Sequence, residues 1–357
     1  MRAMPSTPPR GGAAVPGLHP AGFAALVVAL AACSPAPEPP PPPPEPAWEV
    51  KIPLGLSPDL LAPADNPVTR EKVRLGRKLY FDARLSIAGD VSCATCHHPD
   101  HAFTDNQPVS TGHQGQKGGR SAPTVFNATY NYLQFWDGRA ASLEEQALGP
   151  IQNPIEMGNT LDGMIATLNA APEYRPHFLA AFGDPVITPD RVAKAIASFE
   201  RTVLSGNSKW DRYNAGDLAA LSDAEKRGWE LFKGKAQCTL CHAGQNFSDS
   251  DFHNLGVGIG NAKPDLGRYE VTREDKDRGA FKTPTVREIA RTAPYMHDGG
   301  QKALEEVVEF YNRGGERNKW LDPKIRPLNL TPEEKADLVA FLHALNGESP
   351  QPVGPPG

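Results

Sequence analysis

The sequence contains two Cys-x-x-Cys-His motifs, at residues 93–97 and 238–242, one in each half of the chain. Two thiols with this spacing can form thioether bonds to the vinyl groups of a haem, and the histidine that follows can bind the iron. Pairs of zinc-binding cysteines are the alternative chemistry, but each motif has its own histidine and the two lie far apart. The motifs therefore predict two covalently bound haem c groups, attached at Cys93, Cys96, Cys238 and Cys241 and ligated by His97 and His242.

The second axial position of each iron separates electron carriers from enzymes. Two strong axial ligands close the iron, whereas an open face admits a small molecule. The sequence offers several side chains for this position, and spacing alone does not choose among them. They are His98, His101, His113, His253, His297, Met296 and several tyrosines.

A helical stretch with the pattern Gly-x-x-Leu-aromatic precedes each motif, at residues 76–80 and 228–232. The second stretch opens with a capping box at residues 222–225. Proline next to a threonine N-cap predicts two further helices, over residues 190–203 and 332–345. Gly, Pro, Asn and Asp are frequent between the helices, which indicates long irregular loops. The predicted fold class is mostly α, with two cytochrome c-like haem domains.

The first residues are predicted to be a targeting segment. An apolar stretch at residues 21–32, too short to span a membrane, ends in small residues before Cys33. We therefore assign residues 1–33 to a lipoprotein signal peptide with its lipidation cysteine, and residues 34–49 to a proline-rich tether. The alternative is an ordinary secretory signal in which Cys33 is incidental. The predicted location is the periplasm, with membrane contact only through the lipid anchor.

The rest of the chain is predicted to form one haem domain over residues 50–210 and a second over residues 215–350. The boundary is placed near residues 205–221, a polar stretch that contains Gly206 and Gly216. The chain has five cysteines; four lie in the haem motifs and the fifth is Cys33, so none remains for a disulfide. The net charge of −5, with no basic run, argues against a nucleic-acid partner.

Nearly all of the mature chain resembles the bacterial di-haem cytochrome c peroxidases and the wider superfamily that includes the methylamine-utilisation enzyme MauG. The resemblance implies that the N-terminal domain is the peroxidatic one and that the C-terminal domain transfers electrons. Four segments carry it, namely Gly-His-Gln-Gly-Gln-Lys-Gly at 112–118, Ala-Pro-Thr at 122–124, Gln-Phe-Trp-Asp-Gly-Arg at 134–139 and Thr-Ala-Pro-Tyr-Met-His at 292–297.

The resemblance assigns roles to four residues of the N-terminal half. His113 matches a loop histidine that caps the peroxidatic haem in the resting state, and Trp136 matches an aromatic residue between the haems that assists electron transfer. Gln146 and Glu156 match polar residues of the peroxide pocket, where a carboxylate can move a proton between the two oxygens of peroxide. Without the resemblance, these would be read as a solvated loop histidine, a packed tryptophan and two surface polar residues.

The sixth ligand of the C-terminal haem is where this sequence departs from the peroxidases. They use a methionine on a helix, and the aligned residue here is Tyr311, as in MauG. Leu304, Val307, Val308 and Tyr311 fall at positions i, i+3, i+4 and i+7, so Tyr311 faces inward. Tyr311 is our preferred ligand, and Met296, in the preceding loop, is the weaker alternative. A tyrosinate would favour ferric iron and lower the haem potential.

The family also carries a calcium ion between its domains. Its ligands match the carbonyl oxygens of Thr292 and Pro294 and an asparagine side chain. The asparagine position is Ser121 here, so the calcium prediction depends on Thr292 and Pro294.

The resemblance implies a peroxidase that reduces hydrogen peroxide to water with electrons from a small cytochrome c or a cupredoxin. The first alternative keeps the peroxide chemistry and oxidises a partner protein, as MauG does; Tyr311 supports it. The second is a non-enzymatic electron-transfer cytochrome, in which both haems stay six-coordinate. Homodimer formation and the identity of the donor are left open by the sequence.

Overall fold

The computed structural model describes residues 48–356, which fold into eleven α-helices, two short strands and long connecting loops. The predicted mostly α fold class is therefore confirmed. Cys33 and most of the tether lie outside the described residues. The helices are α1 (Arg70–Tyr80), α2 (Cys93–Cys96), α3 (Leu143–Gln152), α4 (Leu161–Ala170), α5 (Tyr174–Phe182), α6 (Pro189–Glu200), α7 (Lys209–Asn214), α8 (Asp223–Lys233), α9 (Tyr269–Thr272), α10 (Leu304–Asn312) and α11 (Pro332–His343).

The predicted helix starts are correct, and the predicted ends are too late. Helix α6 begins after the N-cap Thr188 and α11 after the N-cap Thr331, each with proline at its first position. The capping box at Ser222 opens α8. Helix α6 ends three residues before the predicted residue 203, and α11 ends two residues before 345. Sequence patterns place helix ends less accurately, because the last turn frays into looser geometry.

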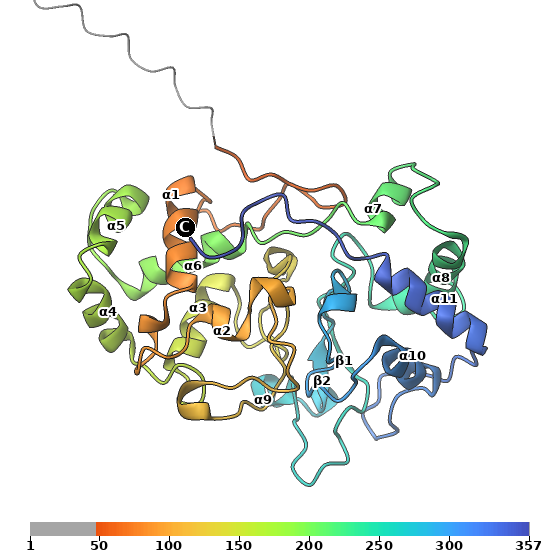
Figure 1. Cartoon of the computed structure of the whole chain (residues 1–357). Coiled ribbons are helices and arrows are strands. Elements are labelled where there is room, and N and C mark those ends of the chain that lie inside the picture. The colour runs from red at the N-terminus through yellow and green to blue at the C-terminus, as the bar shows by residue number, and fades with distance from the viewer. Residues whose placement is uncertain (1–47, 357) are drawn as a thin grey trace, which may run out of the picture. The chain divides into compact units, whose positions relative to one another are not determined.

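The two halves repeat one packing arrangement, in which α1 packs on α6 and α8 packs on α11 (Figure 1). Each pair meets at a glycine. A Cβ atom on Gly76 would lie 1.8 Å from the carbonyl oxygen of Ala195, and one on Gly228 would lie 2.0 Å from that of Asp337. Only glycine allows the backbones to approach this closely. The Gly-x-x-Leu-aromatic pattern thus marks the helix crossing that precedes each Cys-x-x-Cys-His motif.

Apolar side chains form two clusters, one in each half. The first runs from Leu75 to Val203 and packs around α1, α3 and α6. The second runs from Trp210 to Leu345 and packs around α8, α10 and α11. Residues 48–356 nevertheless belong to one compact unit, so the domain boundary near residues 205–221 stays a prediction.

A two-stranded antiparallel sheet lies between the two groups of helices (Figure 1). It consists of β1 (Phe252–Asn254) and β2 (Ala280–Lys282). The backbone N–H of Lys282 donates a 2.8 Å hydrogen bond to the carbonyl oxygen of Trp136, which ties the C-terminal half to a loop of the N-terminal half. This strand therefore helps to position Trp136.

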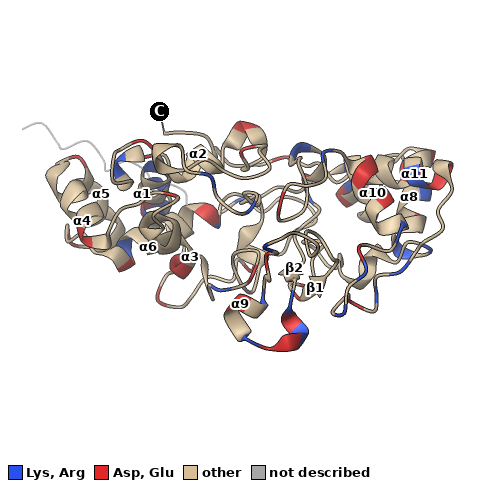
Figure 2. Cartoon of the chain, turned by 90° about the horizontal axis from the view of Figure 1, so that it is seen from below, with Lys and Arg blue, Asp and Glu red and all other residues tan. Residues whose placement is uncertain are grey.

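Charged residues of both signs occur on helices of both groups, for example on α1 and α8 (Figure 2). This mixture agrees with the small net charge. Within residues 48–356, none of the helices combines the length and the apolar character that crossing a membrane requires.

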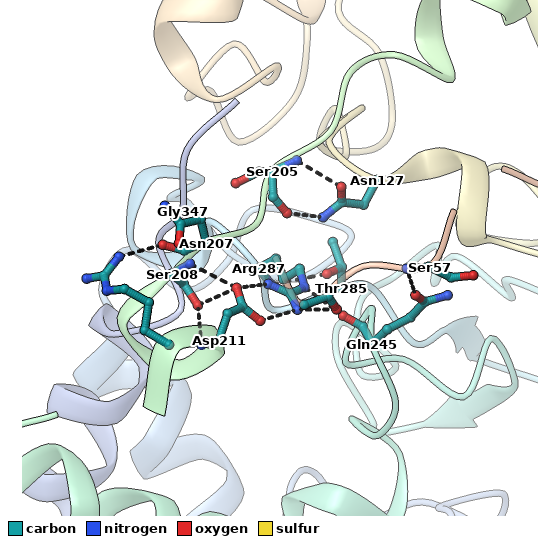
Figure 3. A network of polar contacts seen from close by, with 12 residues as sticks. Ser57, Asn127, Ser205, Asn207, Ser208, Asp211, Gln245, Thr285, Arg287 and Gly347 are labelled. Atoms are coloured by element: carbon teal, nitrogen blue, oxygen red, sulfur yellow. Dashed lines mark hydrogen bonds and ion pairs between the residues drawn. The ribbon is translucent and has the colours of Figure 1, made fainter. Parts of the chain in front are cut away.

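A buried polar network fixes the segment that follows α6 (Figure 3). The Arg287 guanidinium donates to both carboxylate oxygens of Asp211 at 2.8 Å, and both side chains are 2% exposed. Asp211 also accepts from Ser208, with which it forms the capping box of α7. Nearby, Asn127 and Ser205 exchange two hydrogen bonds of 2.9 Å. The polar stretch that the sequence suggested as a boundary thus contains a helix held by buried contacts.

Asp211→Ala is expected to lower the free energy of unfolding by about 3–5 kcal/mol, because it leaves the buried Arg287 charge without its partner. Urea denaturation followed by circular dichroism measures this loss. The control is Asp337→Ala, which breaks an ion pair with Arg227, whose side chain is 61% exposed; it should cost under about 1 kcal/mol. Equal losses in the two variants would contradict the role given to the network.

Candidate functional site

Each Cys-x-x-Cys-His motif lines its own cavity. In the N-terminal motif, the capping box of Ser92 and Thr95 starts α2, and the short helix sets both thiols and His97 against a cavity walled by α3 and α6. In the C-terminal motif, a single 3-10 turn at Cys238–Leu240 places both thiols and His242 against the second cavity. Burial raises the pKa of Cys96 to about 11 and that of Cys238 to about 12, so these thiols are neutral.

The two motif histidines are oriented in the same way. Nδ1 of His97 lies 3.2 Å from the carbonyl oxygen of Phe103, and Nδ1 of His242 lies 3.0 Å from that of Phe247. A carbonyl only accepts, so Nδ1 carries the proton and the lone pair stays on Nε2. Burial lowers the pKa of both imidazoles. A neutral ring fixed through Nδ1 is the form that binds a metal through Nε2.

The zinc alternative does not fit this geometry. Among residues 48–356, the one cluster of side chains close enough to share an ion consists of Cys241, Asp249 and His253. Neither motif brings its two cysteines and its histidine together, as a zinc site requires. A cysteine pair and a histidine spread along the wall of a largely apolar cavity fit a covalently attached haem.

Trp136 lines both cavities. Its indole Nε1 donates a 2.8 Å hydrogen bond to the carbonyl oxygen of Ser121, and its own carbonyl accepts from Lys282. One hydrogen bond thus holds the ring and the other holds the backbone of Trp136 at the wall that the two cavities share. The resemblance placed this residue between the haems, and its role in electron transfer stays a prediction.

Gln146 and Glu156 both line the N-terminal cavity. Gln146 lies on α3, and Glu156 follows that helix in a turn, where its carboxylate accepts a 2.8 Å hydrogen bond from Asn153 Nδ2. Burial raises the pKa of Glu156, which keeps a proton on the group closer to neutral pH. The structure thus brings together the two polar residues that the resemblance named.

His113 is buried but is not among the residues that line the N-terminal cavity. Its Nδ1 lies 3.1 Å from a carboxylate oxygen of Asp90, and its backbone N–H donates to the carbonyl oxygen of Glu156. The His113 loop is therefore attached directly to the turn that holds Glu156. Ligation of the N-terminal haem by His113 stays a prediction.

Both candidates for the sixth ligand of the C-terminal haem line the same cavity. Tyr311 lies on α10, and Leu304, Val307 and Val308 line the cavity beside it, as the helical spacing predicted. Burial raises the pKa of Tyr311, so the phenol is neutral unless a cation lies next to it. Met296 approaches from a loop and has a left-handed backbone, with φ of 69°. The geometry admits either residue, so the choice between them stays a prediction.

The residues assigned to calcium lie at the same cavity. Thr292 and Pro294 line it, and Ser121 is bound through its backbone N–H to the carbonyl oxygen of His297. The three residues thus line one cavity, and calcium binding stays a prediction.

Two chemically important residues were missed from the sequence. Glu200 and Lys282 are buried ionisable residues at the cavity walls. His253, one of the histidines that the sequence offered as an axial ligand, lines the C-terminal cavity and is held between Asp249 and Asp322. Glu200 could have been found, because it lies four residues after Ile196 on the apolar face of α6. The residues around Lys282 give no comparable signal.

Glu200→Gln is expected to remove a pH-dependent loss of stability. Burial raises the pKa of Glu200 from its ordinary value of 4.5 to about 8, so the folded protein binds this proton more tightly than the unfolded chain. The free energy of unfolding that depends on this proton is therefore fully present below pH 4.5 and is lost as the pH rises towards 8. At pH 7 the glutamine variant should be more stable than the wild type by about 3 kcal/mol.

Urea denaturation at pH 5 and pH 7 measures the effect of Glu200→Gln. The matched control is Glu144→Gln on α3. Its ion pair with Arg201 lowers the pKa of Glu144, so this variant should lose stability at pH 7. A glutamine variant of Glu200 that follows the pH profile of the wild type would contradict the burial of an uncharged carboxyl group.

Comparison with known proteins decides the family. The sequence model of the di-haem cytochrome c peroxidase family matches residues 70–219. The methylamine utilization protein MauG of Methylorubrum extorquens is 42% identical over 80% of this chain and 81% of its own length. The chain belongs to the di-haem cytochrome c peroxidase and MauG family. Its members' names identify an oxidoreductase, and the family implies two c-type haems, which the two cavities fit.

The relatives of this chain include both cytochrome c peroxidases and MauG proteins. Cytochrome c551 peroxidase of Nitrosomonas europaea is 40% identical over 82% of this chain and 86% of its own length. A crystal structure described as a MauG-like protein associated with microbial copper homeostasis superposes with a TM-score of 0.76 at 35% identity, over 85% of this chain and 97% of that one. Peroxidases and MauG proteins are thus about equally similar to this chain.

Proposed function

We propose that this protein reduces hydrogen peroxide to water with electrons from a small redox protein, a cytochrome c or a cupredoxin. One peroxide takes up two electrons and two protons and yields two water molecules. The observation that carries the proposal is the position of Trp136 in the wall of both cavities, with Gln146 and Glu156 in the N-terminal one. The C-terminal cavity, the ring of Trp136 and the polar N-terminal cavity then lie in series, as electron transfer from one haem to the other would require.

The side chains of the N-terminal cavity can handle the protons of this reaction. A haem held by Cys93, Cys96 and His97 would supply the iron for this redox chemistry. Glu156, whose pKa is raised by burial, can accept a proton from one peroxide oxygen and return it to the other. Asn153 holds the carboxylate in place, and Gln146 offers an amide for orienting the peroxide. Trp136 gives the second electron a path from the C-terminal site.

A MauG-like oxidation of a partner protein is the second candidate. Tyr311 in the wall of the C-terminal cavity favours it, because a tyrosinate ligand would hold that iron ferric and oppose electron uptake from an ordinary small cytochrome.

We further propose that Cys33 carries a lipid anchor and that the protein works in the periplasm.

Stoichiometry tests the proposed function. Haem-loaded protein mixed with hydrogen peroxide and a reduced small cytochrome should oxidise two cytochrome molecules for each peroxide consumed. Consumption of peroxide without oxidation of cytochrome or cupredoxin would overturn the proposal. A partner protein that became oxidised instead would support the MauG-like candidate.

His113→Gly is expected to let the fully oxidised protein react with peroxide at once, because a coordinated imidazole must leave before peroxide can reach the iron. Stopped-flow absorption spectra of wild type and variant, without prior reduction, measure the two rates. The control is His101→Gln, which changes an exposed histidine of the same half. Equally fast reactions of wild type and His113→Gly would show that His113 is not a resting-state ligand.

A further inference from the structure

Lys282, the last residue of β2, is buried at the junction of the two cavities. Its side chain is 8% exposed and lines both of them. The backbone N–H of Lys282 is bound to Trp136, so the residue is fixed in place. Within residues 48–356, its ammonium group has no ion pair and no hydrogen-bond partner, and burial lowers the pKa of Lys282 to about 8. A buried amine without a partner costs stability, so a partner from outside the chain is expected.

Lys282 has a special place in the shared wall. Of the described residues that line both cavities, it is the one with an ionisable side chain. These residues are Ser121, Ala122, Pro123, Thr124, Asn131, Trp136, Lys282 and Pro284. An anion bound by this ammonium would therefore lie at the boundary between the two sites.

Among residues 48–356, no carboxylate is placed to pair with Lys282. None of these residues contributes an Asp or Glu side chain to the lining of the C-terminal cavity. In the N-terminal cavity, Asp137 and Asp265 both bind Arg120, and Glu156 binds Asn153. Glu200 also lines the N-terminal cavity but makes no contact with Lys282, and burial raises its pKa to about 8, so this carboxyl group is mostly uncharged at pH 7. The missing partner must then be an anion that enters with the molecule that fills the cavities.

We infer that the ammonium group of Lys282 binds a propionate carboxylate of haem at the wall shared by the two cavities. Haem carries two propionates, and they are the only anionic groups that it brings. The inference rests on the two haems that the family implies and not on the proposed reduction of peroxide. Lys282 is a positioning residue: it fixes the haem edge beside Trp136 and neutralises negative charge near the irons.

This contact should set the haem midpoint potentials. A positive charge close to a haem favours the reduced iron, which carries one positive charge fewer. Lys282→Met keeps the length of the side chain and removes the charge. At a fixed applied potential, it should raise the ratio of oxidised to reduced haem by on the order of tenfold for at least one haem, which corresponds to about 59 mV for a one-electron couple.

The experiment is a spectroelectrochemical titration of both haems in the purified, haem-loaded protein, without peroxide. Lys282→Arg should restore the wild-type potentials, because it restores the charge. The matched control is Lys72→Met. Lys72 is equally buried, at 7% exposed, but its ammonium binds Asn66 and the carbonyl of Pro67 and lines neither cavity. This variant should lose stability and leave both potentials unchanged.

Two results would overturn the inference. One is a fully loaded Lys282→Met variant with wild-type potentials. The other is a crystal structure of the haem-loaded wild type in which the Lys282 ammonium lies more than about 4 Å from every propionate oxygen. That structure also decides the matter if Lys282→Met does not take up haem. Because neither measurement uses peroxide, their outcome is separate from that of the proposed function.

Discussion

Replacing His97 by glycine is expected to lower peroxide turnover by more than about a hundredfold, while thioether attachment of the N-terminal haem survives. His97 is the residue that the structure orients for iron in this cavity, because its Nδ1 is fixed by the carbonyl oxygen of Phe103 and its Nε2 is left with a lone pair. Loss of the imidazole removes both the iron ligand and its anchor to the backbone. Steady-state peroxide assays, together with haem staining of the denatured protein, separate lost turnover from lost haem.

The control for His97 is Tyr80→Phe. The Tyr80 hydroxyl donates a 3.0 Å hydrogen bond to the carbonyl oxygen of His97 from a fully buried position on α1. Its loss should cost about 1–3 kcal/mol of stability and leave the ligand in place, so turnover should fall far less. A His97→Gly variant with undiminished peroxide reduction would contradict the assignment of the N-terminal cavity as the site of peroxide reduction.

Local sequence patterns were enough to predict the parts of the site that are defined by spacing. Each Cys-x-x-Cys-His motif predicts its haem-attachment cysteines and its axial histidine. Threonine or serine N-caps predicted the starts of α6, α8 and α11. The inward face of α10 followed from helical periodicity, and the structure confirms that Tyr311 lines the cavity. These features depend on residues within one or two turns of each other, so one segment suffices to predict them.

The features that were missed depend on contacts between distant segments. Lys282 is unusual only because β2 places it against Trp136 and two cavities at once. The Arg287–Asp211 ion pair joins residues from different parts of the C-terminal half, and nothing near either residue predicts it. The contact of His113 with Asp90 likewise joins two loops. Burial of a charge is a property of the assembled fold, and a single sequence shows only its local neighbours.

The C-terminal site decides between the two enzymatic candidates. We expect Tyr311→Met to raise the midpoint potential of the C-terminal haem by at least about 60 mV, a tenfold change in the ratio of reduced to oxidised iron at a fixed potential. The physical reason is that a tyrosinate stabilises ferric iron, whereas the thioether of methionine favours ferrous iron. The variant should also accept electrons from a small cytochrome more readily.

Met296→Leu is the matched control, because Met296 lines the same cavity and leucine keeps its bulk. If Tyr311 is the ligand, this variant should leave the potential nearly unchanged. Redox titration and electron paramagnetic resonance of the ferric protein distinguish the two ligand sets. If Met296→Leu removes the methionine-type low-spin signal and Tyr311→Met changes little, then Met296 binds the iron. Tyr311 would in that case be a buried phenol packed beside the haem, kept neutral by its raised pKa, and the MauG-like candidate would lose the observation that favours it.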